Sequence, residues 1–149
     1  MTPLGAAPGP AEILLVEDNP GDVRLAMEAL KGGALPVSVG VVEDGLEAMA
    51  YLHQEGKYAD APRPDLILLD LNLPGMNGHE VLGEIKRDQV LKRIPVIILS
   101  ISVAEEDLLR AYENHANAFI SKRVNLEQFR SALRAMELFW LMIVKLPPG

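Results

Sequence analysis

Five side chains that could together transfer a phosphoryl group stand at the ends of short apolar segments of this chain. They are Glu17, Asp18, Asp70, Ser100 and Lys122, which end or follow the segments EILLVE, DLILLD, PVIILS and AFIS. Because an unpaired buried carboxylate is costly, we expect Asp70 to lie where its apolar run opens to water or to a cation. If the segments are parallel strands of one sheet, three acids, one hydroxyl and one amine meet at the same edge.

The three carboxylates indicate a metal-assisted reaction at Asp70. Neighbouring carboxylates repel one another, and a hard divalent cation relieves that repulsion; Mg²⁺ suits a small, open oxygen site completed by water. With the metal present, Asp70 can attack phosphorus and form an acyl phosphate. Lys122 would stabilise charge on the transferring group together with the metal, and the Ser100 hydroxyl would bind a phosphoryl oxygen. These residues therefore predict that Asp70 is a phosphate acceptor.

The segments that must position these side chains alternate between strand-like and helical patterns. The predicted strands are residues 12–17, 36–42, 65–70, 95–100 and 118–121. The helices that follow begin with the capping residues Asn19, Asp44, Asn77, Ser102 and Asn125. Asn19 precedes a proline, and each of the other four has Glu or Gln three residues later, which is the capping-box spacing. Alternating βα units with apolar central strands predict a doubly wound α/β domain, a parallel sheet with helices on both faces.

Length, composition and charge limit the classes of function. The 149 residues suffice for one domain, expected over residues 12–149, and the Pro-, Gly- and Ala-rich residues 1–11 are expected to form a flexible tail. The absence of cysteine excludes disulfides, thiolate metal sites and cysteine nucleophiles. A net charge of -7 argues against nucleic-acid binding, and no apolar run reaches the roughly 18 residues that span a bilayer. We therefore expect a cytoplasmic protein without nucleic-acid or membrane partners. The connection over residues 55–64 is expected to be a surface loop before the third strand.

The reactive side chains also resemble those of a known family. Their set is Glu17-Asp18, Asp70 within DLNLPGMNG, Ser100 and Lys122, and it resembles the receiver domain of two-component response regulators from about residue 12 onward. The resemblance implies a flavodoxin-like sheet with strand order 2-1-3-4-5. It also implies that Phe119 is the aromatic switch residue, whose rotamer follows Ser100 when phosphate binds.

The resemblance further implies how the metal is held. Asp70 would be the phosphoacceptor and a metal ligand. Asp18 and the main-chain carbonyl of Asn72 would bind Mg²⁺, with Glu17 nearby through water. The protein would then act in a phosphorelay as a phosphoprotein, and not as an enzyme.

Longer segments are similar to the small response regulators that partner bacterial phytochrome histidine kinases. They are VEDNPGDVRL, YADAPRPDLILLDLNLPGMNG, AEEDLLRAYE and an ending built around FWL and LP. This resemblance implies that the phosphoryl donor is the phosphohistidine of a sensor histidine kinase that responds to red light. The residues after the last helix leave no room for an output domain, so we expect signalling by contact with another protein or by phosphate shuttling.

The last predicted helix carries a core-facing apolar stripe and a second apolar set beside it. The stripe comprises Leu126, Phe129, Leu133, Met136, Trp140 and Ile143, and the second set comprises Leu138, Leu141, Met142 and Val144. A helix that is apolar on several faces must bury them somewhere. We expect the second set to form a homodimer interface or a docking surface for the kinase.

Two departures from the family pattern leave an alternative open. Arg123 follows Lys122 where receivers usually carry proline, and Ile101 follows Ser100 where a small residue is usual. Ile101 is expected to narrow access to the acceptor and slow phosphoryl exchange. The chain could then be a degenerate receiver that acts as a phosphorylation-independent interaction module.

Two other classes fit the sequence less well. Aspartyl-phosphate phosphatases typically have a second acid two residues after the nucleophile, but this chain has Asn72. Flavin or nucleotide carriers of similar architecture would need a phosphate-binding first turn, whereas this turn is acidic and lacks the G-x-G-x-x-G pattern.

Overall fold

The chain alternates strands and helices as predicted. The computed structural model describes residues 10–32, 36–100, 110–121 and 126–139. The strands are β1 (Ala11–Val16), β2 (Val37–Val42), β3 (Leu66–Asp70), β4 (Val96–Ser100) and β5 (Ala118–Ser121). The helices are α1 (Pro20–Lys31), α2 (Gly45–Leu52), α3 (Gly78–Arg87) and α5 (Leu126–Leu138), and the short 3₁₀ helices are η1 (Gly56–Tyr58) and η2 (Leu91–Arg93). β1 begins and ends one residue earlier than predicted, so Glu17 is the first residue beyond the strand.

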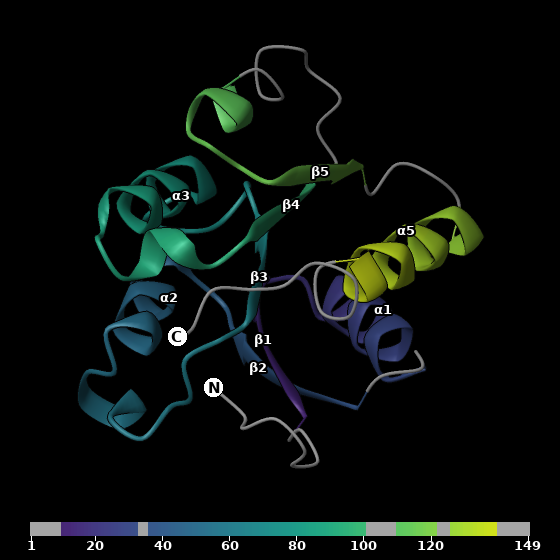
Figure 1. The fold of residues 1–149 in the computed structure, drawn as a ribbon, viewed down its shortest axis with the longest axis horizontal. Coiled ribbons are helices and arrows are strands. Elements are labelled where there is room, and N and C mark those ends of the chain that lie inside the picture. The colour runs from purple at the N-terminus through teal and green to yellow at the C-terminus, as the bar shows by residue number, and fades with distance from the viewer. Residues whose placement is uncertain (1–9, 33–35, 101–109, 122–125, 140–149) are drawn as a thin grey trace.

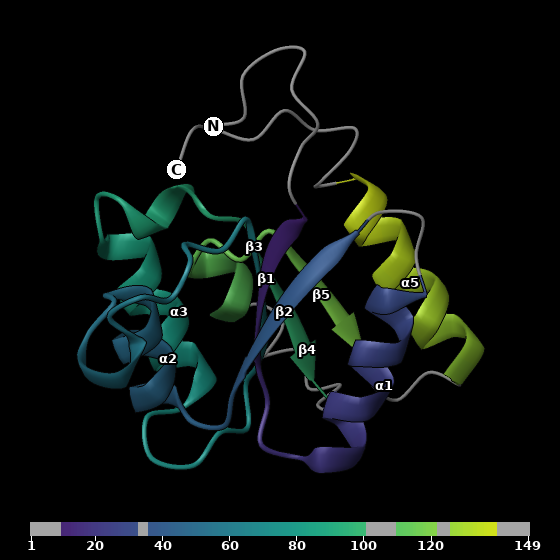
Figure 2. The ribbon, with the colours of Figure 1, turned by 90° about the horizontal axis from the view of Figure 1, so that it is seen from below.

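The strands form one parallel sheet in the order β2-β1-β3-β4-β5, which confirms the predicted flavodoxin-like topology. Helices α2 and α3 cover one face of the sheet, and α1 and α5 lie side by side on the other (Figures 1 and 2). In such a sheet all five strands end at the same edge, where the strand order reverses on either side of β1. Four of the predicted reactive residues, Glu17, Asp18, Asp70 and Ser100, lie at this edge.

Alternate residues of the central strands build two separate core layers. Towards α2 and α3 the sheet contributes Leu14, Val16, Ile67, Leu69, Val96 and Ile98. Towards α1 and α5 it contributes Ile13, Leu15, Leu66, Leu68, Ile97 and Leu99. All residues of β3 and β4 are buried, because helices cover both faces of these central strands. The rigid sheet therefore fixes the strand ends from which the site is built.

Three predicted helix starts are confirmed by their capping hydrogen bonds. The side chain of Asn19 accepts from the N–H of Asp22 at 3.0 Å, before Pro20 opens α1. The Asp44 carboxylate accepts from the N–H of Glu47 at 2.7 Å at the start of α2. Asn77 and Glu80 form a reciprocal capping box that begins α3. The predicted starts at Ser102 and Asn125 lie outside the described residues.

The remaining predictions about the ends and connections hold only in part. The connection 55–64 is largely exposed, but it also contains the 3₁₀ helix η1, which the sequence pattern does not predict. In α5, Phe129 and Leu133 are buried against the sheet, as expected of the core-facing stripe. Residues 1–9 of the predicted tail lie outside the described residues. Among the helices that the structure describes, none has the length and apolar character required to cross a membrane.

Candidate metal and phosphoacceptor site

The register of the sheet brings the predicted acids together. Val16 of β1 pairs with Leu69 of β3. The residues that follow them, Glu17 and Asp70, therefore lie side by side at the ends of adjacent strands. One carboxylate oxygen from each of Glu17, Asp18 and Asp70 lies within 4.8 Å of the others. The convergence expected from the sequence is therefore present for all three acids.

Burial differs among the three carboxylates. Glu17 is 1% exposed and Asp70 is 4% exposed, whereas Asp18 is exposed. Main-chain N–H groups orient the two buried acids: Asn19 donates to Glu17 Oε1 at 3.2 Å, and Asn72 donates to Asp70 Oδ1 at 3.0 Å. Three carboxylates this close repel one another, and the hard oxygen set suits a divalent cation such as Mg²⁺ or Mn²⁺. The donor set thus fits a metal with one side open to water through Asp18.

The loop after Asp70 is tied at both of its ends. The N–H of Gly78 donates to the carbonyl of Leu71 at 3.1 Å, and the capping box at Asn77 fixes the entry into α3. Between them, Gly75 has φ +68, a conformation that favours glycine and that turns the chain after Pro74. Gly78 itself lies so close to the main chain of Asp70 that a side chain there would collide with the Asp70 carbonyl oxygen. This loop carries Asn72, whose main-chain carbonyl was predicted to bind the metal.

The predicted hydroxyl and switch residues lie on the next two strands. Ser100 is fully buried at the end of β4, one residue beyond the pairing of Leu99 with Asp70. Phe119 on β5 pairs with Ile98 of β4 and packs against the core layer under α2 and α3. Ser100 and Asp70 therefore end neighbouring strands, as the sequence predicted.

Several predicted residues cannot be placed. Lys122, Ile101 and Arg123 lie outside the described residues, although Ser121 of β5 pairs with Ser100. The predicted interface residues Leu141, Met142 and Val144 also lie outside them, and Leu138 ends α5 without a described side chain. The amine of the site and the apolar surface of the last helix thus stay predictions.

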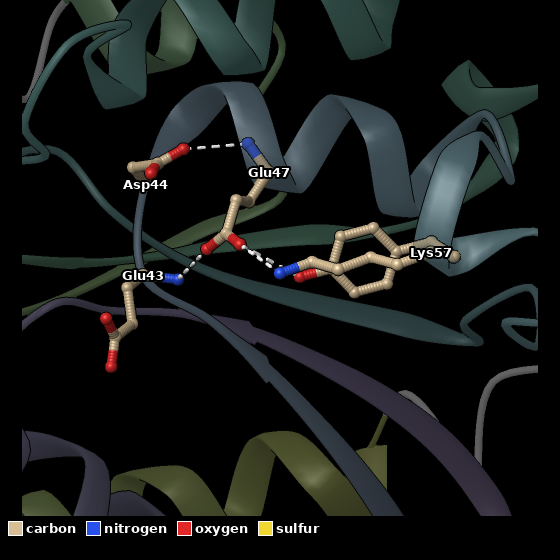
Figure 3. Close-up of polar contacts among 5 residues, drawn as sticks. Glu43, Asp44, Glu47 and Lys57 are labelled. Atoms are coloured by element: carbon tan, nitrogen blue, oxygen red, sulfur yellow. Dashed lines mark hydrogen bonds and ion pairs between the residues drawn. The ribbon is translucent and has the colours of Figure 1, made fainter.

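Sequence reasoning missed a polar cluster around Glu47 (Figure 3). The Glu47 carboxylate accepts hydrogen bonds from Lys57 Nζ at 2.9 Å and from the Tyr58 hydroxyl at 3.2 Å. The hydrogen bond from Lys57 lowers the pKa of Glu47 from its ordinary value. The sequence predicts Glu47 only as the residue three positions after the capping Asp44, and no spacing signal links it to residues ten and more positions later. The cluster fastens the 55–64 connection to the start of α2.

Comparison with known proteins gives consistent results. The model of the family described as response regulator receiver domain matches residues 13–134. Response regulator Rcp1 of Synechocystis sp. is 48% identical over 138 residues, which cover 93% of this chain and 94% of that protein.

Solved structures agree with this assignment. The phosphorylated cyanobacterial phytochrome response regulator RcpA superposes with a TM-score of 0.89 at 53% identity, over 94% of this chain and all of that chain. The Mn²⁺-bound form of Rcp1 superposes with a TM-score of 0.87 at 47% identity, over 93% of this chain and all of that chain.

Proposed function

Because this chain belongs to the response regulator receiver family, we propose that Asp70 accepts a phosphoryl group from the phosphohistidine of a sensor histidine kinase. The observation that carries the proposal is the burial of Asp70 at the end of β3 with carboxylate oxygens of Glu17 and Asp18 within 4.8 Å. A buried aspartate beside two other acids is poorly explained by folding alone, because like charges destabilise the folded state. A reaction at Asp70 explains the arrangement.

In the proposed transfer, a carboxylate oxygen of Asp70 attacks the phosphorus atom. A P–O bond forms as the P–N bond to the donor imidazole breaks, and the imidazole nitrogen keeps the electron pair and takes up a proton. The product is a mixed anhydride, the aspartyl phosphate. The N–H of Asn72, which donates to Asp70 Oδ1, limits rotation of the carboxylate before the attack.

Residues around Asp70 have complementary proposed roles. Asp18, Asp70 and the main-chain carbonyl of Asn72 would hold Mg²⁺, with Glu17 bound to it through water. When bound, the metal would offset negative charge on the phosphoryl oxygens. The hydroxyl of Ser100 would bind one of these oxygens.

Two further proposed roles involve β5 and the residue after it. Lys122 would pair with a phosphoryl oxygen. Phe119 would change rotamer as Ser100 moves towards the phosphoryl group. Both roles come from the family resemblance, supported by the position of β5 beside β4.

The proposed partner is a bacterial phytochrome histidine kinase. Support comes from the similarity to RcpA, a cyanobacterial phytochrome response regulator, at 53% identity. Histidine kinases are phosphorylated by ATP, so we propose that the transfer takes place in the cytoplasm. Association with a second copy through residues 138–144 remains part of the proposal, and no described contact bears on it.

Intact mass after brief exposure to acetyl phosphate and Mg²⁺ tests the acceptor. We expect the wild type to gain one phosphoryl group only with the metal, and Asp70→Asn to gain none. Asp60→Asn, which changes an exposed aspartate in the 55–64 connection, is the matched control and should behave like the wild type. A gain that persists in Asp70→Asn, or no gain in any variant, would contradict the proposal and favour a degenerate receiver.

We also propose that the site does not turn over free phosphate esters. The position two residues after Asp70 is Asn72, which cannot supply the general acid that a phosphatase of this chemistry needs. Incubation with p-nitrophenyl phosphate and Mg²⁺ should release no more p-nitrophenol from the wild type than from Asp70→Asn. Multiple turnovers by the wild type would show a phosphatase.

A further inference from the structure

Gly45, the first residue of α2, is in unusually close contact with the loop that follows Asp70. A Cβ atom built on Gly45 would collide with the carbonyl oxygen of Met76, and it would lie 2.8 Å from Met76 Cβ and 2.9 Å from the Met76 carbonyl carbon. Real Cβ atoms essentially never lie within 3.0 Å of a nonbonded heavy atom. The φ of Gly45 is not positive, so its backbone conformation does not require glycine. The space beside Met76 does.

Met76 belongs to the segment that shapes the acidic site. One end of this segment is held by the hydrogen bond from the N–H of Asn72 to Asp70 Oδ1, at 3.0 Å. The other end is held by the hydrogen bond from Gly78 to Leu71, at 3.1 Å. Between these ties, Pro74 and Gly75 are exposed, and the space beside Gly75 is open. The close packing of Met76 against Gly45 therefore supports this loop from helix α2.

The start of α2 is braced and cannot easily move away from the loop. The Asp44 carboxylate caps the helix through the N–H of Glu47 at 2.7 Å. The Glu47 carboxylate in turn binds Lys57 Nζ at 2.9 Å (Figure 3), and it accepts a hydrogen bond from the Tyr58 hydroxyl at 3.2 Å. The Tyr58 ring packs on Tyr51 of the same helix, with ring centroids 5.3 Å apart. A side chain at position 45 would therefore displace the loop and not the helix.

We infer that Gly45 is a positioning residue for the metal and phosphoacceptor site, acting through Met76 on the loop that carries Asn72. This inference rests on the proposed function, because it assumes that Asp70 and the Asn72 carbonyl meet a metal. Outer contacts of this kind orient the groups that ligate a metal, and their loss typically weakens metal affinity. Glycine at position 45 thus lets helix α2 pack closely against the loop after Asp70, and this packing sets the position of Asn72 in the site.

The test compares Mg²⁺ affinity, measured by titration calorimetry, in the wild type and in Gly45→Ala at a temperature where both are fully folded. We expect affinity to fall about tenfold in Gly45→Ala. In the metal-free Gly45→Ala protein, the main-chain N–H hydrogen of Asn72 should also exchange with solvent faster, because its hydrogen bond to Asp70 is disturbed. A purely structural role would lower the melting temperature and leave both of these quantities unchanged.

Gly83→Ala is the matched control. Gly83 is a buried helical glycine of α3, and a Cβ there would meet the flexible end of Arg87, at 3.0 Å. The added methyl group should leave Mg²⁺ affinity unchanged. Met76→Gly is measured alongside, because it removes the Cβ of Met76, which lies beside Gly45, and adds no atom. Met76→Gly should also lower the Mg²⁺ affinity, and it provides the test if Gly45→Ala does not fold.

The outcomes separate this inference from the proposed function. If the wild type binds Mg²⁺ and is phosphorylated, but folded Gly45→Ala and Met76→Gly match it, the positioning role of Gly45 is overturned. If the wild type neither binds Mg²⁺ nor accepts phosphate, the proposed function fails instead. If both variants weaken Mg²⁺ binding and Gly83→Ala does not, the inference is supported.

Discussion

The site places like charges together that the fold alone would keep apart. Glu17 and Asp70 are buried, and Asp18 stands beside them in contact with water. Hydrogen bonds from the main-chain N–H groups of Asn19 and Asn72 offset part of the cost of burying the two acids. Repulsion among the three carboxylates opposes folding, and binding of a cation at the site would relieve it.

Neutralising one of these acids is therefore expected to stabilise the metal-free protein. In EDTA, Asp70→Asn should unfold at a higher temperature than the wild type, with a gain on the order of 1 kcal/mol. The asparagine oxygen can still accept the N–H of Asn72, so the variant removes charge with little loss of hydrogen bonding. Thermal denaturation followed by circular dichroism measures the difference, with Asp60→Asn as the exposed control. An unchanged or lower melting temperature would show that the charge of Asp70 is already balanced within the protein.

Between elements, Lys86 joins α3 to the segments that begin β4 and β5. Its ammonium donates to the carbonyls of Lys92 at 3.3 Å and Ile94 at 2.9 Å, and to Asn117 Oδ1 at 3.2 Å. The same Asn117 oxygen accepts the N–H of Val96 at 2.8 Å. These partners are uncharged, and burial lowers the pKa of Lys86 from 10.5 to about 8. The folded protein must therefore keep a poorly hydrated charge at neutral pH.

This pKa predicts a pH dependence of stability that is specific to Lys86. Between the folded pKa of about 8 and the unfolded value of 10.5, the unfolded chain binds more protons, so the free energy of unfolding rises with pH. From about pH 7.5 to about pH 10, the wild type should gain on the order of 1 kcal/mol relative to Lys86→Met, allowing for partial exposure of the amine. Urea denaturation at several pH values measures this. Lys92→Met, at an exposed side chain, is the control and should show no such trend.

The sequence could predict the elements because their signals are local. Neighbouring residues suffice to predict the apolar run that ends at Asp70 and the capping box at Asn77, and both are present. The contacts between elements could not be predicted in the same way. Lys86 donates to Asn117, which is 31 positions later in the sequence, and Gly45 of α2 packs against Met76 of the loop after β3. Such contacts depend on the packing of whole helices, which hydrophobic period and capping residues do not specify.

For the whole molecule, charge makes metal binding and folding interdependent. The chain carries a net charge of -7, and the acids at the carboxyl edge of the sheet add a local concentration of negative charge. Any cation screens this charge to some degree, and monovalent salt acts on the whole surface. A divalent ion held by the three acids binds only where the folded sheet brings them together. Its stabilising effect should therefore depend on single residues of the site, which general screening does not.

We predict that Mg²⁺ raises the melting temperature of the wild type and has much less effect on Asp18→Asn. A ligand that binds only the folded state at a hundredfold excess over its Kd adds about 2.7 kcal/mol, which for a domain of this size corresponds to roughly 5–10 °C. Asp18 is exposed, so its replacement removes a proposed metal ligand without disturbing the core. The measurement is a melting curve in MgCl₂ and in NaCl of equal ionic strength, for both proteins. An equal rise in the two salts, or in the two proteins, would mean that Mg²⁺ acts by screening the net charge and not by occupying the acidic site.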